Sequence, residues 1–302
     1  MQAVTRSALL DSAVSVLDEH LMPTRTIAVN VPPGARLLDA TPSLDLILLA
    51  DRERLWLHSA DDLIGVDLAA VEAATRLPSG RLLVTAPTME QQVWQGRAYE
   101  SRAEHYAYLI ETNGTVVDRV ELDVADAGVM LVPHPHDGSI LLDAGEGQDG
   151  SRIFIAREAA GRLHVQAVLN NVVAAGFDRA GERLLLTPHP SFNTGVSLVS
   201  WPSLDPLNTL TAEDVGDGFD LYGCFIGDQV LLTCYEHGAV LCSSSLEPLA
   251  WVQLGDGTPE CIVGVTHDAF GVDLWRDRSV SATVWRLPTG LHVDRHARAH
   301  ER

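Results

Sequence analysis

Two short segments carry residue types that could move protons. Histidine exchanges a proton near neutral pH, and a neighbouring carboxylate would orient its ring. The candidates for such acid–base chemistry are His189, Glu236 and His237. The neighbouring Asn193 and Tyr235 could bind a ligand beside them. A histidine on a loop also serves as a surface hydrogen-bonding group, so the sequence supports both interpretations.

Residues 88–105, TMEQQVWQGRAYESRAEH, form a polar insertion that contains Trp94, Arg97 and Tyr99. The aromatic rings could stack on a ligand, and the arginine could hold an anionic group. Long loops are usually functional or disordered, and the two aromatic residues argue against disorder. We therefore expect a long loop that acts as a lid or specificity loop, with a plain structural cover as the alternative.

The glycine-rich segment GEGQDG (145–150) offers three polar side chains, those of Glu146, Gln148 and Asp149. A phosphate cradle would need a helix N-terminus, but the following SRIFIA (151–156) has a strand pattern. The carboxylates could bind a cation through oxygen ligands, although no complete calcium-loop spacing exists. We expect a hairpin turn with polar tips, and we retain the three residues as candidate ligand contacts.

Histidine and cysteine spacing gives little support for a metal. His134-Pro-His136 falls at a turn before an apolar strand, on the opposite face from the polar loops. Three histidines spaced by four lie near the C-terminus: His292, His296 and His300. Four cysteines, none in a CxxC pair, are expected to be reduced and packed: Cys224, Cys234, Cys242 and Cys261. We predict no metal site and no cofactor.

Charge narrows the choice of partner. The 302 residues carry a formal net charge of −20, with a pI of about 4.8. Such a surface repels phosphate backbones and anionic lipids, so we expect neither nucleic acid nor membrane as a partner. All 21 basic residues are arginine, which excludes Schiff-base chemistry and a P-loop lysine. A protein partner or a small-molecule ligand remains, in a chain expected to be cytoplasmic.

These candidate residues must be positioned by a repeated element. A turn precedes a short apolar run six times, and the runs start at residues 46, 82, 140, 184, 230 and 270. Four of the turns match closely, each with a glycine: Gly80, Gly138, Gly181 and Gly227. In the fourth repeat, four short strand patterns fit between residues 172 and 210. Four strands in about 40–45 residues is the period of a propeller blade.

The repeat period and the continuous apolar second strand resemble the WD-repeat-like β-propellers over about residues 25–294. The Trp-Asp dipeptide and the Gly-His opening of that family are absent, so the resemblance implies architecture and no functional residue. It implies an all-β propeller of six blades, with seven as the alternative. No GxSxG, HExxH, GxGxxG or P-loop motif occurs, which removes several common enzyme classes.

Local residue patterns predict the secondary structure at both ends of the chain. An apolar stripe of Leu10, Val14, Leu17 and Leu21 predicts an N-terminal helix over residues 7–21, within an arm of residues 1–24. The strand RTIAVNV (25–31) is expected to complete the last sheet of the propeller, and LHVD (291–294) competes for that place. We assign 25–294 to one propeller domain and 295–302 to a C-terminal tail.

In a propeller, the loops between second and third strands open on one face around the central channel. They include the 88–105 insertion, GEGQDG, the His189 and Tyr235 loops, and Arg276. Loops held on a rigid scaffold often carry function. We predict a non-catalytic binding platform for a protein or small ligand on this face. The alternative is a lyase, hydrolase or cyclase that acts at the channel mouth under the 88–105 loop.

Overall fold

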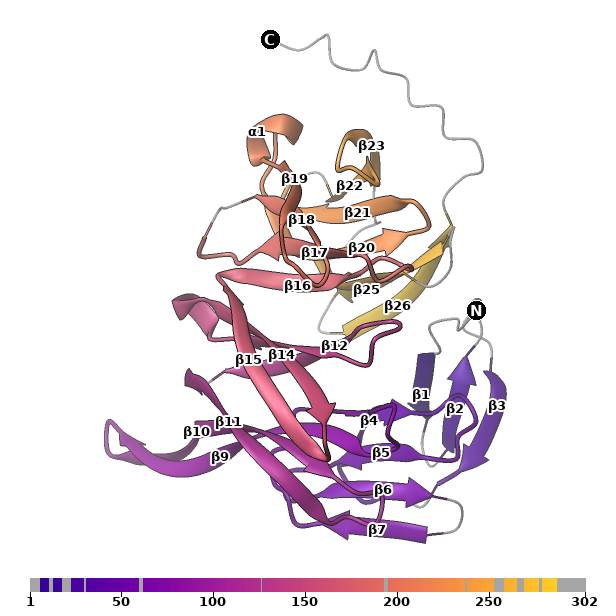
Figure 1. Cartoon of the computed structure of the whole chain (residues 1–302), viewed down its shortest axis with the longest axis vertical. Coiled ribbons are helices and arrows are strands. Elements are labelled where there is room, and N and C mark those ends of the chain that lie inside the picture. Colours follow the sequence, from indigo (N-terminus) through magenta and orange to yellow (C-terminus); the bar gives the residue numbers. More distant parts are fainter. Residues whose placement is uncertain are drawn as a thin grey trace. The chain divides into compact units, whose positions relative to one another are not determined.

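A computed structural model describes residues 6–10, 13–17, 23–29, 31–59, 62–125, 127–192, 195–236, 238–252, 258–264, 269–276 and 279–286 (Figure 1). The chain divides into two compact units, residues 5–171 and residues 172–302 together with 1–4. We call them the N-terminal and C-terminal units and describe each by itself. Both are built almost wholly from antiparallel strands.

The described residues of the N-terminal unit form four sheets, each a series of sequential antiparallel strands. The first has three strands: β1 (Arg6–Leu10), β2 (Ala13–Leu17) and β3 (Pro23–Ala28). The second comprises β4 (Arg36–Ala40), β5 (Ile47–Ala50), β6 (Leu55–Ser59) and β7 (Asp62–Val66). The third comprises β8 (Ala73–Arg76), β9 (Leu82–Trp94), β10 (Arg97–Ile110) and β11 (Val116–Ala125). The fourth comprises β12 (Gly128–Pro133), β13 (Ile140–Gly145), β14 (Ser151–Ala159) and β15 (Arg162–Asn170).

The C-terminal unit continues the same pattern with three sheets among its described residues. One comprises β16 (Val172–Phe177), β17 (Arg183–Pro188), β18 (Val196–Ser200) and β19 (Pro206–Leu210). The next comprises β20 (Phe219–Ile226), β21 (Gln229–Cys234), β22 (Gly238–Ser243) and β23 (Pro248–Val252). The last comprises β24 (Thr258–Gly264), β25 (Ala269–Arg276) and β26 (Ser279–Arg286). Two short helical turns occur in the part of the chain that the structure describes: the 3₁₀ turn η1 (Gly147–Asp149) in the N-terminal unit and α1 (Ala212–Val215) in the C-terminal unit.

The six predicted repeats are confirmed as six sheets. Each apolar run forms the second strand of its sheet: β5, β9, β13, β17, β21 and β25. Ile47–Ala50 is buried at every residue, and so is the Leu82–Ala86 part of β9. Both faces of these strands are covered because sheets pack against them on either side. The described residues form seven sheets in all, and the number of blades, six or seven, stays a prediction.

The repeated turn has a backbone reason for its glycine. Gly80, Gly138, Gly181 and Gly227 all have positive φ, between 56° and 91°. This left-handed conformation is costly for residues with a Cβ and easy for glycine. The same turn between first and second strands therefore recurs, and it holds each second strand in register with the first.

Apolar clusters lie between consecutive sheets within each unit. In the N-terminal unit, Ile47 and Val14 belong to the cluster that joins the first and second sheets. Leu48 and Val84 join the second and third, and Leu83 and Leu142 join the third and fourth. In the C-terminal unit, three consecutive sheets are joined by clusters around Leu185, Val230 and Leu232, and around Leu231, Ile262 and Val272. Face-to-face burial of neighbouring sheets thus supplies the core.

The prediction of an N-terminal helix over residues 7–21 is wrong. Residues 6–10 and 13–17 form strands β1 and β2, with Leu10 paired with Ala13. The alternation in AVSVL fits a strand: Val14 is buried in a core cluster, and Ser15 hydrogen-bonds Thr26 across the sheet at 2.8 Å. Sheet pairing and burial have overridden the helical spacing of the leucines.

The expected place of residues 25–31 is also corrected. Most of that segment belongs to β3, which pairs with β2 in the N-terminal sheet rather than with the last sheet. The LHVD segment (291–294) and the tail from residue 295 lie outside the described residues. The predicted domain limits, 1–24, 25–294 and 295–302, stay a prediction.

Three cysteines are free and buried, as expected of packed thiols: Cys224, Cys234 and Cys242. Burial raises the pKa of both Cys234 and Cys242 to about 12, so these thiols are protonated at neutral pH. The hairpin register places Gly238 opposite Cys234 and Val230 opposite Cys242. The two thiols are therefore not direct cross-strand partners.

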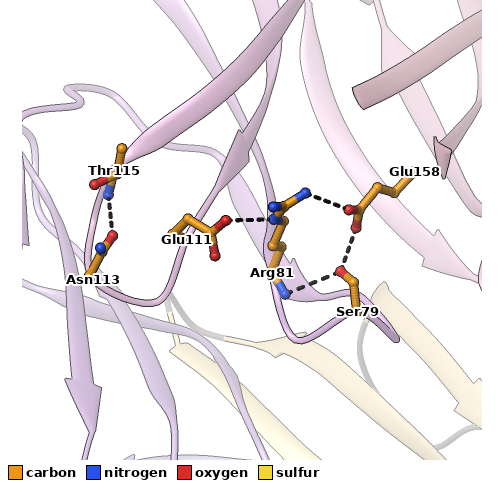
Figure 2. Close-up of polar contacts among 6 residues, drawn as sticks. All are labelled: Ser79, Arg81, Glu111, Asn113, Thr115 and Glu158. Atoms are coloured by element: carbon orange, nitrogen blue, oxygen red, sulfur yellow. Dashed lines mark hydrogen bonds and ion pairs between the residues drawn. The ribbon is translucent and has the colours of Figure 1, made fainter. Parts of the chain in front are cut away.

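A polar cluster connects the third and fourth sheets on the side of the glycine turns (Figure 2). Arg81 Nε donates to Glu111 Oε1 at 2.7 Å, and its Nη1 donates to Glu158 Oε1 at 2.8 Å. Ser79 Oγ donates to the second oxygen of Glu158. The hydrogen bond to Glu111 is the main cause of a raised pKa for Arg81. One guanidinium thus joins the β8–β9 and β10–β11 turns of the third sheet to strand β14 of the fourth.

We expect Arg81→Ala to lower the melting temperature of the chain. The substitution leaves Glu111 and Glu158 without their shared cation, whereas Arg81→Lys retains the charge but loses the two-pronged geometry. The order of stability should be wild type, then lysine, then alanine, with Arg52→Ala as a control at an exposed arginine. Equal melting temperatures for the wild type and the Arg81→Ala variant would show that the cluster does not stabilise the fold.

Candidate binding surface

The 88–105 insertion follows a second strand as predicted, but it is not a loop. Its residues extend β9 and β10 into a hairpin that runs beyond the rest of its sheet (Figure 1). Among the described strands, β9 and β10 pair only with each other from Met89 to Arg102, because pairing with β8 ends at Thr85 and pairing with β11 ends at Glu104. We call residues 88–103 the extension.

The turn of the extension explains why it forms a hairpin. Gln95 and Gly96, between Trp94 and Arg97, have φ values of 51° and 76°. Two consecutive residues with positive φ are the signature of the two-residue turn that matches the twist of a hairpin. Two polar segments of equal length, Met89–Trp94 and Arg97–Arg102, flank the Gln-Gly pair. This arrangement is the sequence signal for a hairpin, and the prediction of a loop did not take it into account.

Strand register gives the extension two distinct faces. On one face, cross-strand pairs join Glu90 with Ser101, Gln92 with Tyr99, and Trp94 with Arg97. Tyr99 Oη donates to Gln92 Oε1 at 2.7 Å, and Gln92 Nε2 donates to Glu90 Oε1 at 2.6 Å. We call this the Trp94 face. The opposite face carries the pairs Met89–Arg102, Gln91–Glu100 and Val93–Ala98.

Both faces of the extension expose large apolar side chains. Trp94 is 66% exposed and Tyr99 44% exposed on one face, while Val93 is 73% exposed on the other. All residues from Thr88 to Glu100 are exposed. The extension therefore presents apolar surface that no described residue of its own unit covers.

A buried polar cluster anchors the root of the extension. At this root the register of β10 shifts against both neighbouring strands. Between Arg102 and His105, two residues of β10 oppose one of β9, and between Glu104 and His105 the register with β11 shifts as well. His105, directly after the shift, is 0% exposed, and neither ring nitrogen makes a hydrogen bond to the described residues. Its Nε2 lies 3.8 Å from Glu72 Oε2. Such bulges re-aim a strand, and here one separates the sheet from the extension.

Glu72 is the centre of this cluster, in the segment before β8. Its Oε2 accepts a hydrogen bond from the backbone N–H of Val129 on β12 at 2.8 Å. Arg102 Nε lies 3.2 Å from Glu72 Oε1, within ion-pair distance but without an aligned hydrogen bond. Arg36 Nη2 donates to the carbonyl oxygens of Val71 and Glu72. Burial raises the pKa of Glu72 above its ordinary value, against the opposing effects of Val129, Arg102 and His105.

A groove of about 720 Å³ lies beside the root of the extension. The lining comprises Thr88, Glu90, Ala103, Glu104, Glu121, Leu122, Asp123, Val124, Glu146 and Arg152. It therefore brings together the extension, strand β11 and the GEGQDG turn. Glu146 is the residue before η1, and Gln148 and Asp149 are exposed within that single turn. The expected polar hairpin turn is confirmed, and Glu146 is the residue of that turn that lines the groove.

The groove is strongly acidic. Five of its lining residues are carboxylates, and its one cation is Arg152. Arg152 Nη1 is already 2.7 Å from Asp123 Oδ2 and also donates to the Asp123 carbonyl oxygen. Glu104 accepts a hydrogen bond from Tyr106 Oη at 2.8 Å, which is the main cause of a raised pKa for Tyr106. With five carboxylates and one guanidinium among the described lining residues, the groove carries a surplus of negative formal charge.

The predicted acid–base residues lie in the C-terminal unit. His189 is almost fully buried, and its Nδ1 accepts a hydrogen bond from Ser191 N at 3.2 Å. The Glu236 backbone N–H donates to Asp217 Oδ2 at 3.0 Å, and Tyr235 is exposed with its backbone bonded to Gly218 O. His237 and Asn193 lie outside the described residues, and for Arg276 the description covers the backbone at the end of β25. Their roles as catalytic or ligand-binding groups stay predictions.

His134 serves the turn in which it lies. Its Nδ1 accepts hydrogen bonds from the backbone N–H groups of His136 and Asp137, at 3.1 and 2.8 Å. As expected, the turn joins first and second strands, β12 and β13. Within the described ranges, no three histidine, cysteine or acidic side chains gather in a way that could hold a metal ion. Over the same ranges, the chain has no helix of the length and apolar character needed to cross a bilayer.

Solved structures identify the fold. The β-propeller domain of Cps50 (Swd1) from Myceliophteria thermophila matches with a TM-score of 0.56 and 10% identity, over 91% of this chain and 90% of that domain. This chain is a β-propeller. Its sheets of sequential antiparallel strands and its repeat agree with the resemblance to WD-repeat-like propellers.

Two other solved structures are similar to this propeller. The computationally designed Ika8 protein matches with a TM-score of 0.55 and 10% identity, over 85% of this chain and 73% of that one. Pyrococcus horikoshii acylaminoacyl peptidase matches with a TM-score of 0.55 and 12% identity, over 94% of this chain and 48% of the peptidase. No protein-family model and no curated protein matches the sequence. At these identities the likeness concerns the fold alone.

Proposed function

We propose that this propeller is a non-catalytic binding platform that holds a protein partner on the extension. The observation that carries the proposal is the exposure of Trp94, Tyr99, Val93 and Met89 on a hairpin that extends past its sheet. Exposed apolar patches of this kind mark interaction sites in soluble proteins. Tryptophan and tyrosine are also enriched among the residues that dominate binding energy.

The physical cost of the extension supports this proposal. An isolated two-stranded hairpin is marginally stable in water, because it buries little apolar surface. The extension adds few buried contacts to its own sheet and leaves a tryptophan in solvent. A partner that covers one face would bury these rings and complete the packing that the unit lacks. The chain's charge of −20 favours a protein partner over nucleic acid or an anionic membrane, and a cytoplasmic location fits the same proposal.

The small-molecule enzyme receives less support from the geometry. That hypothesis needs Trp94, Arg97 and Tyr99 to close over a substrate. In the N-terminal unit these side chains lie out along the extension, and none of the three is among the residues that line the groove. The extension is also a regular hairpin with a tight turn rather than a long loop that could fold over as a lid.

A shortened hairpin tests the platform. Replacing Glu90–Ser101 with Asn-Gly should leave a two-residue turn between Met89 and Arg102 and retain the Arg102–Glu72 contact. We expect an unchanged melting temperature and at least a tenfold loss of partner recovered by cross-linking and mass spectrometry from host lysate. Trp94→Ala/Tyr99→Ala should give most of that loss, and Val116→Ala, at an exposed valine on β11, should give none. Equal recovery by the shortened chain would contradict the proposal.

A further inference from the structure

We infer that the partner segment held by the extension is an extended, arginine- or lysine-rich peptide. In this inference the peptide lies on the Trp94 face, with one cationic side chain in the groove and another against Trp94 and Tyr99. The inference rests on the proposed platform and names the chemistry of its partner. It commits to a cationic peptide because five carboxylates and one arginine line the groove, whereas Arg97, beside Trp94, adds one cation at the far end of the same face.

The groove and the Trp94 face form one continuous surface along β9. Thr88 and Glu90 line the groove, and strand alternation places Gln92 and Trp94 on the same face. The hydrogen bonds from Gln92 to Glu90 and from Tyr99 to Gln92 confirm that these side chains lie together. A ligand that enters the groove therefore meets the two aromatic rings next along the strand.

Charge decides what would enter the groove. Glu90, Glu104, Glu121, Asp123 and Glu146 line it, and the guanidinium of Arg152 is engaged by Asp123. Carboxylate oxygens accept hydrogen bonds and pair with guanidinium or ammonium groups. These carboxylates lie on β9, β10, β11 and the turn before η1, and such a spread suits a long flexible cation better than a small ion. In keeping with this, the described part of the chain holds no metal-like cluster. An anionic ligand would be repelled.

The aromatic rings suit the same ligand. A cation above a tryptophan or tyrosine ring is attracted by the negative face of the ring, and arginine makes such contacts most often. Trp94 and Tyr99 are on diagonal positions of neighbouring strands, so both can contact one guanidinium. Residues Glu90 and Trp94 are about 13 Å apart along the strand at 3.3 Å per residue. An extended peptide spans that distance in about four residues, so two arginines four positions apart match the surface.

A fluorescently labelled hexapeptide, Arg-Gly-Ser-Gly-Arg-Gly with blocked ends, tests this inference. Fluorescence polarisation with the full chain should show saturable binding that weakens as salt is raised. The triple variant Glu90→Gln, Glu104→Gln, Glu121→Gln should bind at least tenfold more weakly, and so should Trp94→Ala. The matched control is Glu53→Gln, Glu213→Gln, Glu247→Gln, which removes the same charge from exposed sites elsewhere and should bind like the wild type. A glutamate version of the peptide should not bind.

The outcomes separate this inference from the platform proposal. If both triple variants weaken binding equally, the attraction is a general effect of the net charge and the inference is wrong. It is also wrong if the hexapeptide fails to bind the folded wild type. In either case the platform stands if the shortened hairpin still loses its partner. If the shortened hairpin keeps the partner, the platform proposal fails as well.

Discussion

Replacing Gly264 with alanine should destabilise the C-terminal unit by about 3 kcal/mol. Gly264 ends β24, and a Cβ built on it would lie 2.3 Å from the carbonyl oxygen of Phe225 on β20. Real Cβ atoms do not approach an oxygen so closely, and a backbone carbonyl cannot rotate away as a flexible side chain can. The strands must separate instead, which loosens the cluster around Ile262, Leu231 and Val272.

Hydrogen exchange and chemical denaturation would measure this effect. Amides of β20 and β24 should lose protection in the Gly264→Ala variant, while those of β5 and β13 in the other unit should not. Gly145→Ala is the matched control, because it is also a strand glycine but a Cβ there would meet its nearest atom at 4.0 Å. Similar denaturation midpoints for both variants would show that β20 and β24 are not packed as closely as described.

Replacing Glu72 with alanine should cost about 2 kcal/mol of stability, because the buried N–H of Val129 loses its acceptor. Glu72→Gln retains an acceptor oxygen at nearly the same place and should lose much less. Urea denaturation would separate the two variants, and His58→Asn would serve as a control at a second buried side chain with an unpaired nitrogen. Equal losses in the alanine and glutamine variants would mean that the hydrogen bond to Val129 contributes little.

The charge of Glu72 also predicts a dependence on pH. Its pKa is raised in the folded chain by burial, so the folded state binds the proton more tightly than the unfolded state. The contribution of Glu72 to stability is therefore largest at low pH and falls as pH rises from 4.5, its ordinary value, through the raised value. Arg102, His105 and Arg36 surround the carboxylate and reduce the effect. As the pH rises through this range, the Glu72→Gln variant should therefore gain stability relative to the wild type.

The repeat made most of the fold predictable from sequence. An apolar run behind a glycine turn is dictated by burial of both strand faces and by a left-handed backbone, both local requirements that leave a visible pattern. The N-terminal hairpin was missed because apolar residues spaced by three or four, Leu10, Val14 and Leu17, also fit two short strands. There β2 pairs with both β1 and β3, and Val14 is buried in a core cluster. These long-range contacts, the Ser15–Thr26 hydrogen bond among them, are not visible in local spacing.

The candidate surface was predictable only in part. Composition singled out Trp94 and Tyr99, and the turn position singled out Glu146. The cluster of Glu72, Arg102 and His105 was not foreseen, since Glu72 lies 30 and 33 residues before its two partners in the sequence and no motif connects them. Contacts of this kind arise from the register shift in β10, which sequence pattern does not report.

The exclusive pairing of the two strands in the extension has a further consequence. Opening that hairpin breaks no bond to β8 or β11, so it can melt and reform without disturbing the propeller. Its amides should exchange with solvent far faster than those of residues 105–110, which pair on both sides. A partner must then order the hairpin as it binds, which weakens its affinity but lets the hairpin adapt to partners of different shape. The platform would therefore favour reversible association over permanent assembly.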